Sequence, residues 1–231
     1  MTASMDQLDG KTLDGLDFCA KAYALFEQLR TEPGAVKRLT LRTSKVEKRL
    51  LDEIFPICRY IQTYYRPGRY ISVRWLSGSQ SYEAELQQRG DYVNLGYFEK
   101  SAFLEVTSAM HPNEHWSRKL LSEGEISYAP EGIDSKKGTP LKSEPVVFSN
   151  FEHVLRFTQF VVASIRNKSI SDYPDNTSLI VLCHLNNLYT PEDWLLLVSE
   201  VERAVDFKSF REVLLLDALT DRFTPLALPV L

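Results

Sequence analysis

The 231-residue sequence predicts one α/β domain with a mixed central sheet flanked by helices. Three observations support this fold class. An amphipathic helical pattern precedes three segments that alternate apolar and polar residues, and two continuous apolar runs near the C-terminus are typical of strands buried on both faces. A helical pattern separates those two runs, which predicts a right-handed parallel crossover. We therefore expect antiparallel and parallel strand pairs in the same sheet.

The N-terminal part is predicted to be helical. Residues 1–14 are polar and rich in aspartate, so we expect them to fray. Apolar residues recur at helical spacing between Phe18 and Leu29, and again between Val46 and Ile61. Pro56 lies inside the second pattern, which predicts a kink or a late helix start near it.

The middle of the chain changes period. The predicted strands, which alternate apolar and polar residues, are residues 70–76, 82–86 and 102–107. A short helix is expected over about 113–122, and a connection rich in Gly, Pro, Ser and Lys follows it. Short edge strands are expected in that connection around Ile126 and Val146.

The last third alternates helix and strand. In chain order we expect a helix over 150–168, a strand over 178–183, a helix over 191–205 and a strand over 213–216. We interpret residues 1–36 as an N-terminal helical extension and residues 37–231 as the α/β domain.

The net charge of −4 hides a strongly uneven distribution. Residues 37–74 hold ten basic and three acidic side chains, a local charge of +7, which leaves −11 for the remainder. Such a segment is typical of a surface that binds a polyanion, although a solvated helix face gives the same pattern. The candidate nucleic-acid contacts are Lys45, Lys48, Arg49, Arg66, Arg69, Arg74 and Arg118. Tyrosines 60, 64, 65 and 70 interleave with them, either as stacking groups for bases or as core residues.

Cysteine content and hydropathy bear on the cellular environment. Three widely spaced cysteines favour a reducing compartment over a disulfide framework. The N-terminus does not resemble a signal peptide, and the apolar runs are shorter than the ~20 residues of a membrane span. We expect a cytoplasmic protein without a membrane partner. The sequence leaves the oligomeric state open, a homodimer included.

Acidic residues on two consecutive predicted strands give the strongest chemical signal. In residues 82–86, Glu83 and Glu85 project from the face opposite Tyr82 and Ala84. On the next strand, Glu105 lies on the face opposite the small apolar residues. If the strands are neighbours, carboxylates converge as in sites that hold Mg²⁺ or Mn²⁺. Exposed glutamates on a half-solvated sheet would produce the same pattern.

These residues resemble the PD-(D/E)XK, or restriction-endonuclease-like, nuclease superfamily. The matching pieces are Glu53 on a helix, Glu83 on a strand, and Glu105-Val106-Thr107 on the following strand. The resemblance implies a restriction-endonuclease-like core that hydrolyses nucleic-acid phosphodiester bonds. It further implies that Glu83, Glu105 and the Val106 carbonyl are Mg²⁺ or Mn²⁺ ligands and that Glu53 assists.

The sequence departs from the family pattern at two positions. The first acid is Glu83 rather than an aspartate, and Thr107 stands where the family has lysine. A hydroxyl group carries no positive charge, so a cation from another element would have to replace it. Candidates are Arg118 and Lys119 on the next helix and Lys168 on the long one. If none reaches the acids, the protein is an inactive interaction module on the same fold.

A histidine motif offers a third interpretation. His111-Pro112-Asn113-Glu114-His115 fits the H-x-x-E-H pattern of zinc peptidases, with two histidine ligands and Glu114 as general base. Pro112 prefers the first helical turn and so tends to exclude His111 from the helix. Zinc is therefore less favoured than magnesium, and a simple helix start is the competing interpretation.

Overall fold

The computed structural model describes residues 4–134, 140–185, 190–205, 209–220 and 222–226. Its main sheet has seven strands in the order β1-β2-β3-β4-β7-β8-β9. The strands are β1 (Thr12–Asp14), β2 (Tyr70–Trp75), β3 (Ala84–Arg89), β4 (Ser101–Ala109), β7 (Thr177–Cys183), β8 (Glu212–Asp217) and β9 (Phe223–Pro225). The helices are α1 (Gly15–Arg30), α2 (Ala35–Leu41), α3 (Lys45–Arg49), α4 (Phe55–Tyr64), α5 (Asp91–Asn94), α6 (Glu114–Ser122), α7 (Asn150–Lys168) and α8 (Pro191–Ala204).

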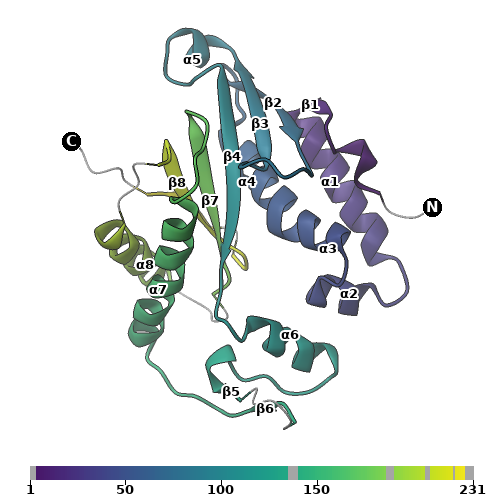
Figure 1. Ribbon diagram of the computed structural model, residues 1–231, viewed down its shortest axis with the longest axis vertical. Coiled ribbons are helices and arrows are strands. Elements are labelled where there is room, and N and C mark those ends of the chain that lie inside the picture. Colours follow the sequence, from purple (N-terminus) through teal and green to yellow (C-terminus); the bar gives the residue numbers. More distant parts are fainter. Residues whose placement is uncertain (1–3, 135–139, 186–189, 206–208, 221, 227–231) are drawn as a thin grey trace.

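The sheet is mixed, as the sequence predicts. Strands β1 to β4 pair in antiparallel fashion, β4 pairs with β7 and β7 with β8 in parallel, and β9 closes the edge antiparallel to β8. Figure 1 shows three layers, with α7 and α8 on one face of the sheet and α1, α3 and α4 on the other. The predicted α/β class with a mixed central sheet flanked by helices is confirmed.

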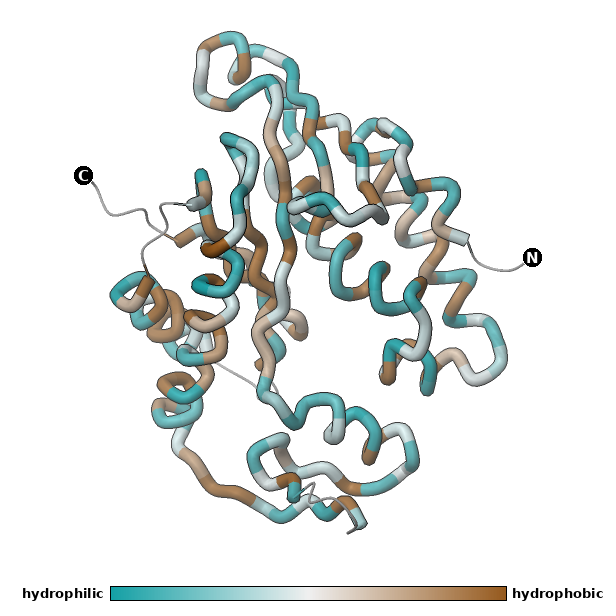
Figure 2. Tube along the Cα trace, viewed as in Figure 1, coloured by the Kyte–Doolittle hydropathy of each residue, from teal (hydrophilic) through white to brown (hydrophobic). Residues whose placement is uncertain are grey.

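Each face of the sheet has its own apolar core. The α1–α4 side buries Leu104 and Val106 of β4 against helix residues such as Phe18 and Ile57. The α7–α8 side buries β7 and β8 residues against side chains such as Val161. Strand β7 is buried along its whole length, which explains its continuous apolar sequence, and Figure 2 shows hydrophobic residues concentrated on the central strands.

A π-helical turn, η2 (Leu50–Ile54), joins α3 to α4. The Phe55 N–H donates to the Leu50 carbonyl, five residues back, and α4 then begins with Pro56 in its first turn. Proline lacks an N–H and clashes with a regular preceding turn, so a helix distortion next to it is expected. The helix is therefore distorted near Pro56, as a π turn between α3 and α4, and it does not start late there.

Two expectations for loop regions are wrong. Residues 4–14 do not fray but form a 3₁₀ turn, η1 (Met5–Gln7), and strand β1, and Gly10 N–H donates to Trp75 O at 2.9 Å. Edge strands near Ile126 and Val146 are absent from the described residues. A separate two-stranded sheet instead joins β5 (Ile133–Asp134) to β6 (Lys142–Ser143), preceded by η3 (Pro130–Gly132). Gly132 allows this pairing because a Cβ there would lie 2.0 Å from the Glu144 carbonyl oxygen.

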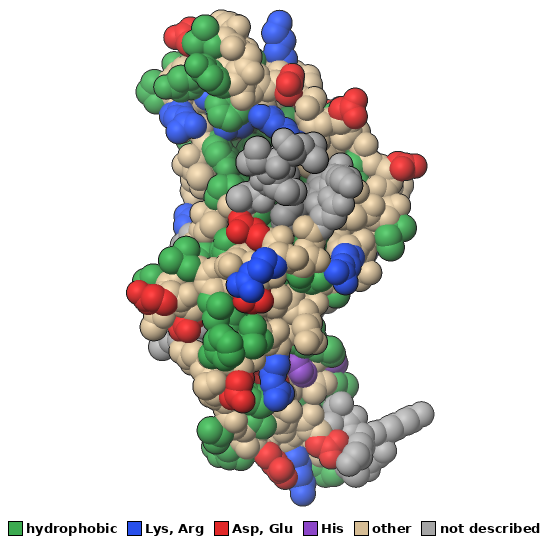
Figure 3. All heavy atoms as spheres, turned by 90° about the vertical axis from the view of Figure 1, so that its left-hand side faces the viewer, with side chains coloured by type: hydrophobic (Ala, Val, Ile, Leu, Met, Phe, Trp, Pro, Cys, Tyr) green, Lys and Arg blue, Asp and Glu red, His purple; other side chains and the backbone are tan. Residues whose placement is uncertain are grey.

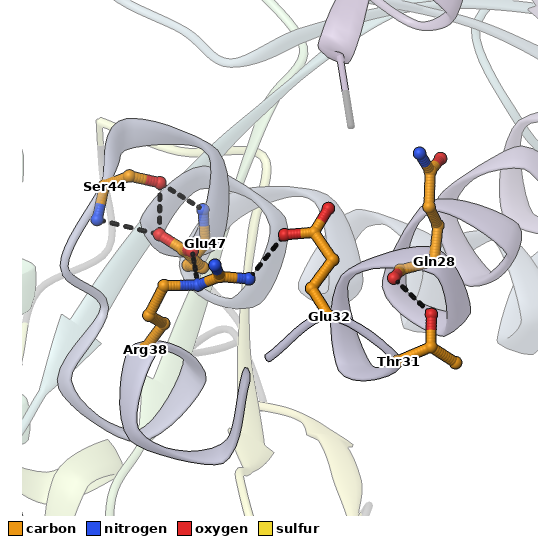
Figure 4. A network of polar contacts seen from close by, with 6 residues as sticks. All are labelled: Gln28, Thr31, Glu32, Arg38, Ser44 and Glu47. Carbon is orange, nitrogen blue, oxygen red and sulfur yellow. Dashed lines mark hydrogen bonds and ion pairs between the residues drawn. The ribbon is translucent and has the colours of Figure 1, made fainter. Parts of the chain in front are cut away.

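Internal ion pairs neutralise part of the basic segment. The Arg38 guanidinium lies between Glu32 at 2.6 Å and Glu47 at 3.2 Å, which links the start of α2 to α3 (Figure 4). Glu47 also accepts the Ser44 N–H in a capping box at the start of α3. The boundary predicted at residues 36 and 37 falls inside α2, and α1 packs into the same core as β2 to β4.

The helices show no membrane-spanning character. In the described part of the chain, none combines the length and the apolar sequence that crossing a bilayer requires.

Candidate active site at the open edge of β4

Glu83, which directly precedes β3, lies across from Glu105 of the neighbouring strand β4. Ala84 pairs with Leu104 and Glu85 with Phe103, and the Glu83 N–H donates to Leu104 O at 2.8 Å. The same register places Glu83 opposite Glu105. Both side chains project from the face that does not carry Leu104 and Val106, as the alternation predicts.

Glu53 joins this pair from the helical layer. It lies in η2, and its carboxyl group shares a hydrogen bond with that of Glu83. Strand β3 begins only at Ala84, so in the described chain β4 has no ladder partner on that side beyond this point. This open edge allows a residue from the α1–α4 layer to meet two residues from the opposite face of the sheet. Glu53, Glu83 and Glu105 form what we call the acid cluster.

Lys168 brings a positive charge to the acid cluster. It is the last residue of α7, and its Nζ contacts Glu105 Oε1. Glu105 is 2% exposed, so this ion pair is largely shielded on the acid side. Of the cations considered from the sequence, Lys168 is the one that the structure places here.

Lys119 lies elsewhere, and Thr107, at the position of the family's lysine, carries no charge. Lys119 is exposed on α6, with its Nζ 5.6 Å from the Trp116 ring centroid. Thr107 lies two residues beyond Glu105 on the same face of β4, and Val106 points into the core on the other face. The Val106 side chain therefore cannot face the acids, and only its main chain is adjacent to them.

Burial is the main influence on the pKa values of the acid cluster. Burial, and then the charge of Glu83, raise the pKa of Glu53 to about 7. Burial also raises the pKa of Glu105 to about 7, although the hydrogen bond and charge of Lys168 oppose the shift. The pKa of Glu83 is raised by burial as well. Three carboxyl groups thus share one close ammonium group, which leaves an excess of negative charge when all ionise.

A partly open sheet face continues from the acid cluster toward β2. Glu85 lies on this face, where it accepts from Tyr82 OH at 2.9 Å and pairs with Arg74 at 3.3 Å. The opposite face of the same strands is fully buried, whereas Arg74 and Gln87 are exposed. On β2 and β3, the face that carries Glu83 and Glu85 is therefore the more accessible one.

The predicted nucleic-acid contacts are spread over several places. Lys45 and Lys48 are exposed on α3, and Lys48 and Arg49 act electrostatically on Glu53. The Arg49 guanidinium also donates to Ser77 O at 2.8 Å. These three residues are the part of the predicted set that belongs to the helix carrying Glu53.

Arg66 lies at the far end of the sheet. Its guanidinium is 5.8 Å from the Tyr92 ring centroid, beside the exposed Leu95 and Tyr97 around α5. Figure 3 shows hydrophobic and basic side chains side by side at this upper end.

Arg69 cannot contact a polyanion outside the protein, because it is 1% exposed. Its Nε donates to Gln88 at 2.8 Å and its guanidinium lies 3.6 Å from the Phe98 ring centroid. Tyr60 is buried beside it, so that tyrosine belongs to the core. Arg118 pairs with Glu114 at 2.8 Å in a different part of the molecule. Sequence alone gives no signal that separates a buried arginine from an exposed one.

The histidine motif does not gather into a ligand set. Helix α6 begins at Glu114, so His111 lies outside it, as Pro112 predicts. His115 is exposed and its Nδ1 lies 3.0 Å from Pro112 O, whereas Glu114 is buried against Arg118. His111 instead lies near Glu131 and His153.

Whether the acid cluster could hold a metal ion depends on how many protein ligands that ion needs. In the described residues, no group of three or more His, Cys, Asp or Glu side chains has a metal-holding arrangement. Mg²⁺ needs fewer protein ligands, since it keeps several waters and is commonly bound by one or two carboxylates. Glu83 and Glu105 supply two such carboxylates in a site with excess negative charge, so the donor set fits Mg²⁺ or Mn²⁺.

Comparison of the chain with protein-family models, with curated proteins and with solved structures finds no match.

Proposed function

We propose that the protein is a metal-dependent nuclease that hydrolyses phosphodiester bonds in nucleic acid at the acid cluster. The observation that supports this best is the meeting of Glu53, Glu83 and Glu105 with Lys168 at the open edge of β4. The carboxylates come from a helix and two consecutive strands, in the chain order of the PD-(D/E)XK pattern. Its buried free cysteines fit a cytoplasmic enzyme.

In this proposal, Lys168 supplies the positive charge that Thr107 lacks. The ammonium group reaches Glu105 from the end of α7, in place of a lysine two residues along β4. In this proposal it orients the attacking water and offsets charge on the scissile phosphate. Burial lowers the pKa of Lys168, but the hydrogen bond to Glu105 and the negative charges around it together raise that pKa, so Lys168 stays protonated at neutral pH.

The three carboxylates have separate roles. Glu83 and Glu105 hold the metal ion, which when bound lowers the pKa of a water ligand and stabilises charge on the phosphate. Glu53, in the π turn, donates a hydrogen bond to Glu83 when it is protonated, because this bond raises the pKa of Glu53 and lowers that of Glu83. Lys48 and Arg49, on or next to the same helical turn, draw the nucleic-acid backbone toward the acids.

The test compares two glutamates on the same sheet face. Wild type, Glu105→Gln and Glu85→Gln are incubated with end-labelled single-stranded and duplex DNA and RNA, in Mg²⁺, Mn²⁺ or EDTA. We expect metal-dependent cleavage by wild type, at least about a 100-fold loss in Glu105→Gln, and at most a few-fold change in Glu85→Gln. Glu85 is a matched control for Glu105. It lies on the same face of the sheet, on β3, which neighbours the strand that carries Glu105.

The competing function is an inactive interaction module on the same fold. That function predicts nucleic-acid or protein binding without cleavage. It also predicts no rise in melting temperature when Mg²⁺ or Mn²⁺ is added to wild type. Absence of both cleavage and metal stabilisation in wild type would reject the nuclease proposal.

A further inference from the structure

A second site lies at the carboxyl ends of the parallel strands β7 and β8. A cavity of 380 Å³ there is lined by Arg42, Arg118 and His184, together with Glu114 and apolar residues such as Leu39. His184 directly follows β7, Arg118 comes from α6, and Arg42 ends α2. In open α/β sheets, the carboxyl edge of the parallel strands is where ligands bind most often.

An adjoining cavity of 280 Å³ shares Arg42, His184 and Ala218 with the first. The rest of its wall is largely apolar, with Phe55 and Tyr23 stacked at 5.1 Å between ring centroids. One cavity thus carries three donor side chains, with the Glu114 carboxylate bound to Arg118 in the same wall, and its neighbour offers an apolar and aromatic surface.

The two cavities are separate from the acid cluster. In the parallel pair, Glu105 is level with Leu179 and Ala109 with Cys183. His184 therefore lies five residues further along the strand direction than Glu105, roughly 16 Å at the usual rise per residue. A ligand at His184 is not a ligand of the acid cluster.

His184 carries a hydrogen-bond donor without an acceptor. The residue is 8% exposed, and its Nδ1 lies 3.3 Å from the terminal nitrogen of Arg118. A guanidinium group can only donate, so Nδ1 accepts and the neutral ring holds its proton on Nε2. Burial, with the charges of Arg118 and Arg42, lowers the pKa of His184 to about 3, which keeps the ring neutral. Nε2 has no hydrogen-bond partner within the described chain.

Arg42 and Arg118 are held in place around this donor by carboxylates. Arg42 Nε lies 2.7 Å from Asp52, and Arg118 Nε donates to Glu114 at 2.8 Å. Each ion pair is made through Nε and positions a guanidinium group at the cavity wall. Arg42 has φ of 52°, a left-handed conformation in which glycine is the usual residue at a helix end. The chain thus keeps an arginine where its backbone favours glycine.

We propose that the donor-lined cavity binds the phosphate group of a phosphate monoester, with the adjoining apolar cavity taking its organic part. Two guanidinium side chains and one histidine side chain line the cavity, and they come from three different segments. This arrangement suits a tetrahedral anion with acceptors on several sides better than a planar carboxylate. The proposal does not depend on nuclease activity. The phosphate has two sources to be distinguished, a free nucleotide and the 5′ end of an oligonucleotide.

The experiment measures binding to the full chain by calorimetry and by ¹⁵N NMR of the histidine rings. The probes are inorganic phosphate, adenosine 5′-monophosphate, a 5′-phosphorylated oligonucleotide, its 5′-hydroxyl counterpart, and acetate. EDTA is present throughout, so that the acid cluster holds no metal. The sequence contains four histidines, so the His184 Nε2–H signal can be assigned by substitution. We expect that signal to shift with adenosine monophosphate.

Two variants test the cavity in different ways. His184→Leu removes the donor, and Ala218→Phe fills the shared wall from an exposed position that leaves the polar groups unchanged. Each is expected to weaken phosphate-monoester binding at least tenfold. Ala218→Phe keeps the test valid if His184→Leu does not fold. Glu105→Gln is expected to bind like wild type, which separates this site from the proposed nuclease site.

The probes that bind identify the source of the phosphate group. Binding of adenosine monophosphate assigns a free nucleotide, and binding of the 5′-phosphorylated oligonucleotide alone assigns a polynucleotide end. Either binding result supports the proposed site if Ala218→Phe weakens that binding. The proposal is overturned if wild type binds no phosphate-bearing probe, if acetate binds as tightly as phosphate, or if Ala218→Phe binds like wild type.

Discussion

The acid cluster and the donor-lined cavity both hold charged groups, but each leaves a different kind of group uncompensated. At the acid cluster, three carboxyl groups surround one ammonium group, and the pKa values of Glu53 and Glu105 rise to about 7. At the cavity, Arg42 and Arg118 are each matched by a carboxylate, and the unsatisfied group is a neutral N–H. The first imbalance is relieved by a cation, and the second by a hydrogen-bond acceptor.

This difference predicts what kind of ligand each place would accept if the two proposals are right. An excess of like charge is a long-range property, so it attracts an ion of the opposite sign and responds to pH. An unpaired donor is a local, directional property, so it selects an acceptor at hydrogen-bond distance and is insensitive to pH while the ring is neutral. Variants that change the charge of the acid cluster should therefore not affect the unpaired donor at the cavity, and the reverse should also hold.

The largest expected effect is on stability at the cavity. Arg42→Met leaves Asp52 half-buried without its ion-pair partner, and the free energy of unfolding should fall by about 3 kcal/mol. The double variant Arg42→Met with Asp52→Asn should recover a large part of that loss, because the charge is removed with its partner. Urea denaturation of the two single variants and the double variant measures the coupling. Additive losses would show that the ion pair contributes nothing.

The next effect concerns cleavage at the acid cluster. Lys168→Met keeps the aliphatic chain but removes the ammonium group, so the metal-dependent cleavage rate should fall about 100-fold. The pH profile should also move to higher pH, because Glu105 loses the charge that opposes its raised pKa. Lys168→Arg should restore part of the rate. Lys119→Met is the control, and an equal loss in that variant would contradict the role of Lys168.

A smaller effect is expected in the pH dependence of stability. The pKa of Glu53 is raised from 4.5 to about 7, so the folded state binds protons more tightly than the unfolded state in that window. Its contribution to stability is present at low pH and is lost as pH rises toward 7. Glu53→Gln should flatten this decline in urea titrations carried out in EDTA between about pH 5 and pH 8. An unchanged slope would contradict the raised pKa.

The smallest effect is expected on the open sheet face. Arg74→Ala removes a partly exposed ion pair with Glu85 and should change the free energy of unfolding by less than about 1 kcal/mol. Thermal denaturation at low and high salt checks this. A larger, salt-independent loss would show that the sheet face is a structural contact rather than an accessible surface.

Sequence patterns predicted the parts of the fold and site that depend on periodicity. The alternation in residues 82–86 and 102–107 gave the faces of Glu83 and Glu105, and the continuous apolar run at 178–183 gave the central parallel strand. Both patterns arise because a strand presents alternate residues to opposite faces.

The remaining features depend on contacts between distant segments. Lys168 stood among several candidate cations, and only packing of α7 on β4 selects it. Arg69 belongs to the same basic run as Arg66, yet one is buried and the other exposed. His184 follows an apolar run without any motif, and its unpaired nitrogen is visible only once Arg118 is placed beside it.

The π turn at Leu50–Ile54 lets one short segment serve two distant sites. Consecutive residues point in different directions there, with Asp52 toward Arg42 and Glu53 toward Glu83. A π turn holds one residue more than an α turn, which changes the helical phase of α3 against α4 by roughly 100°. Removing a single residue from this turn would therefore rotate either the basic face of α3 or the core face of α4 out of place. We expect this segment to reject a one-residue deletion that an exposed turn such as 123–125 would accept.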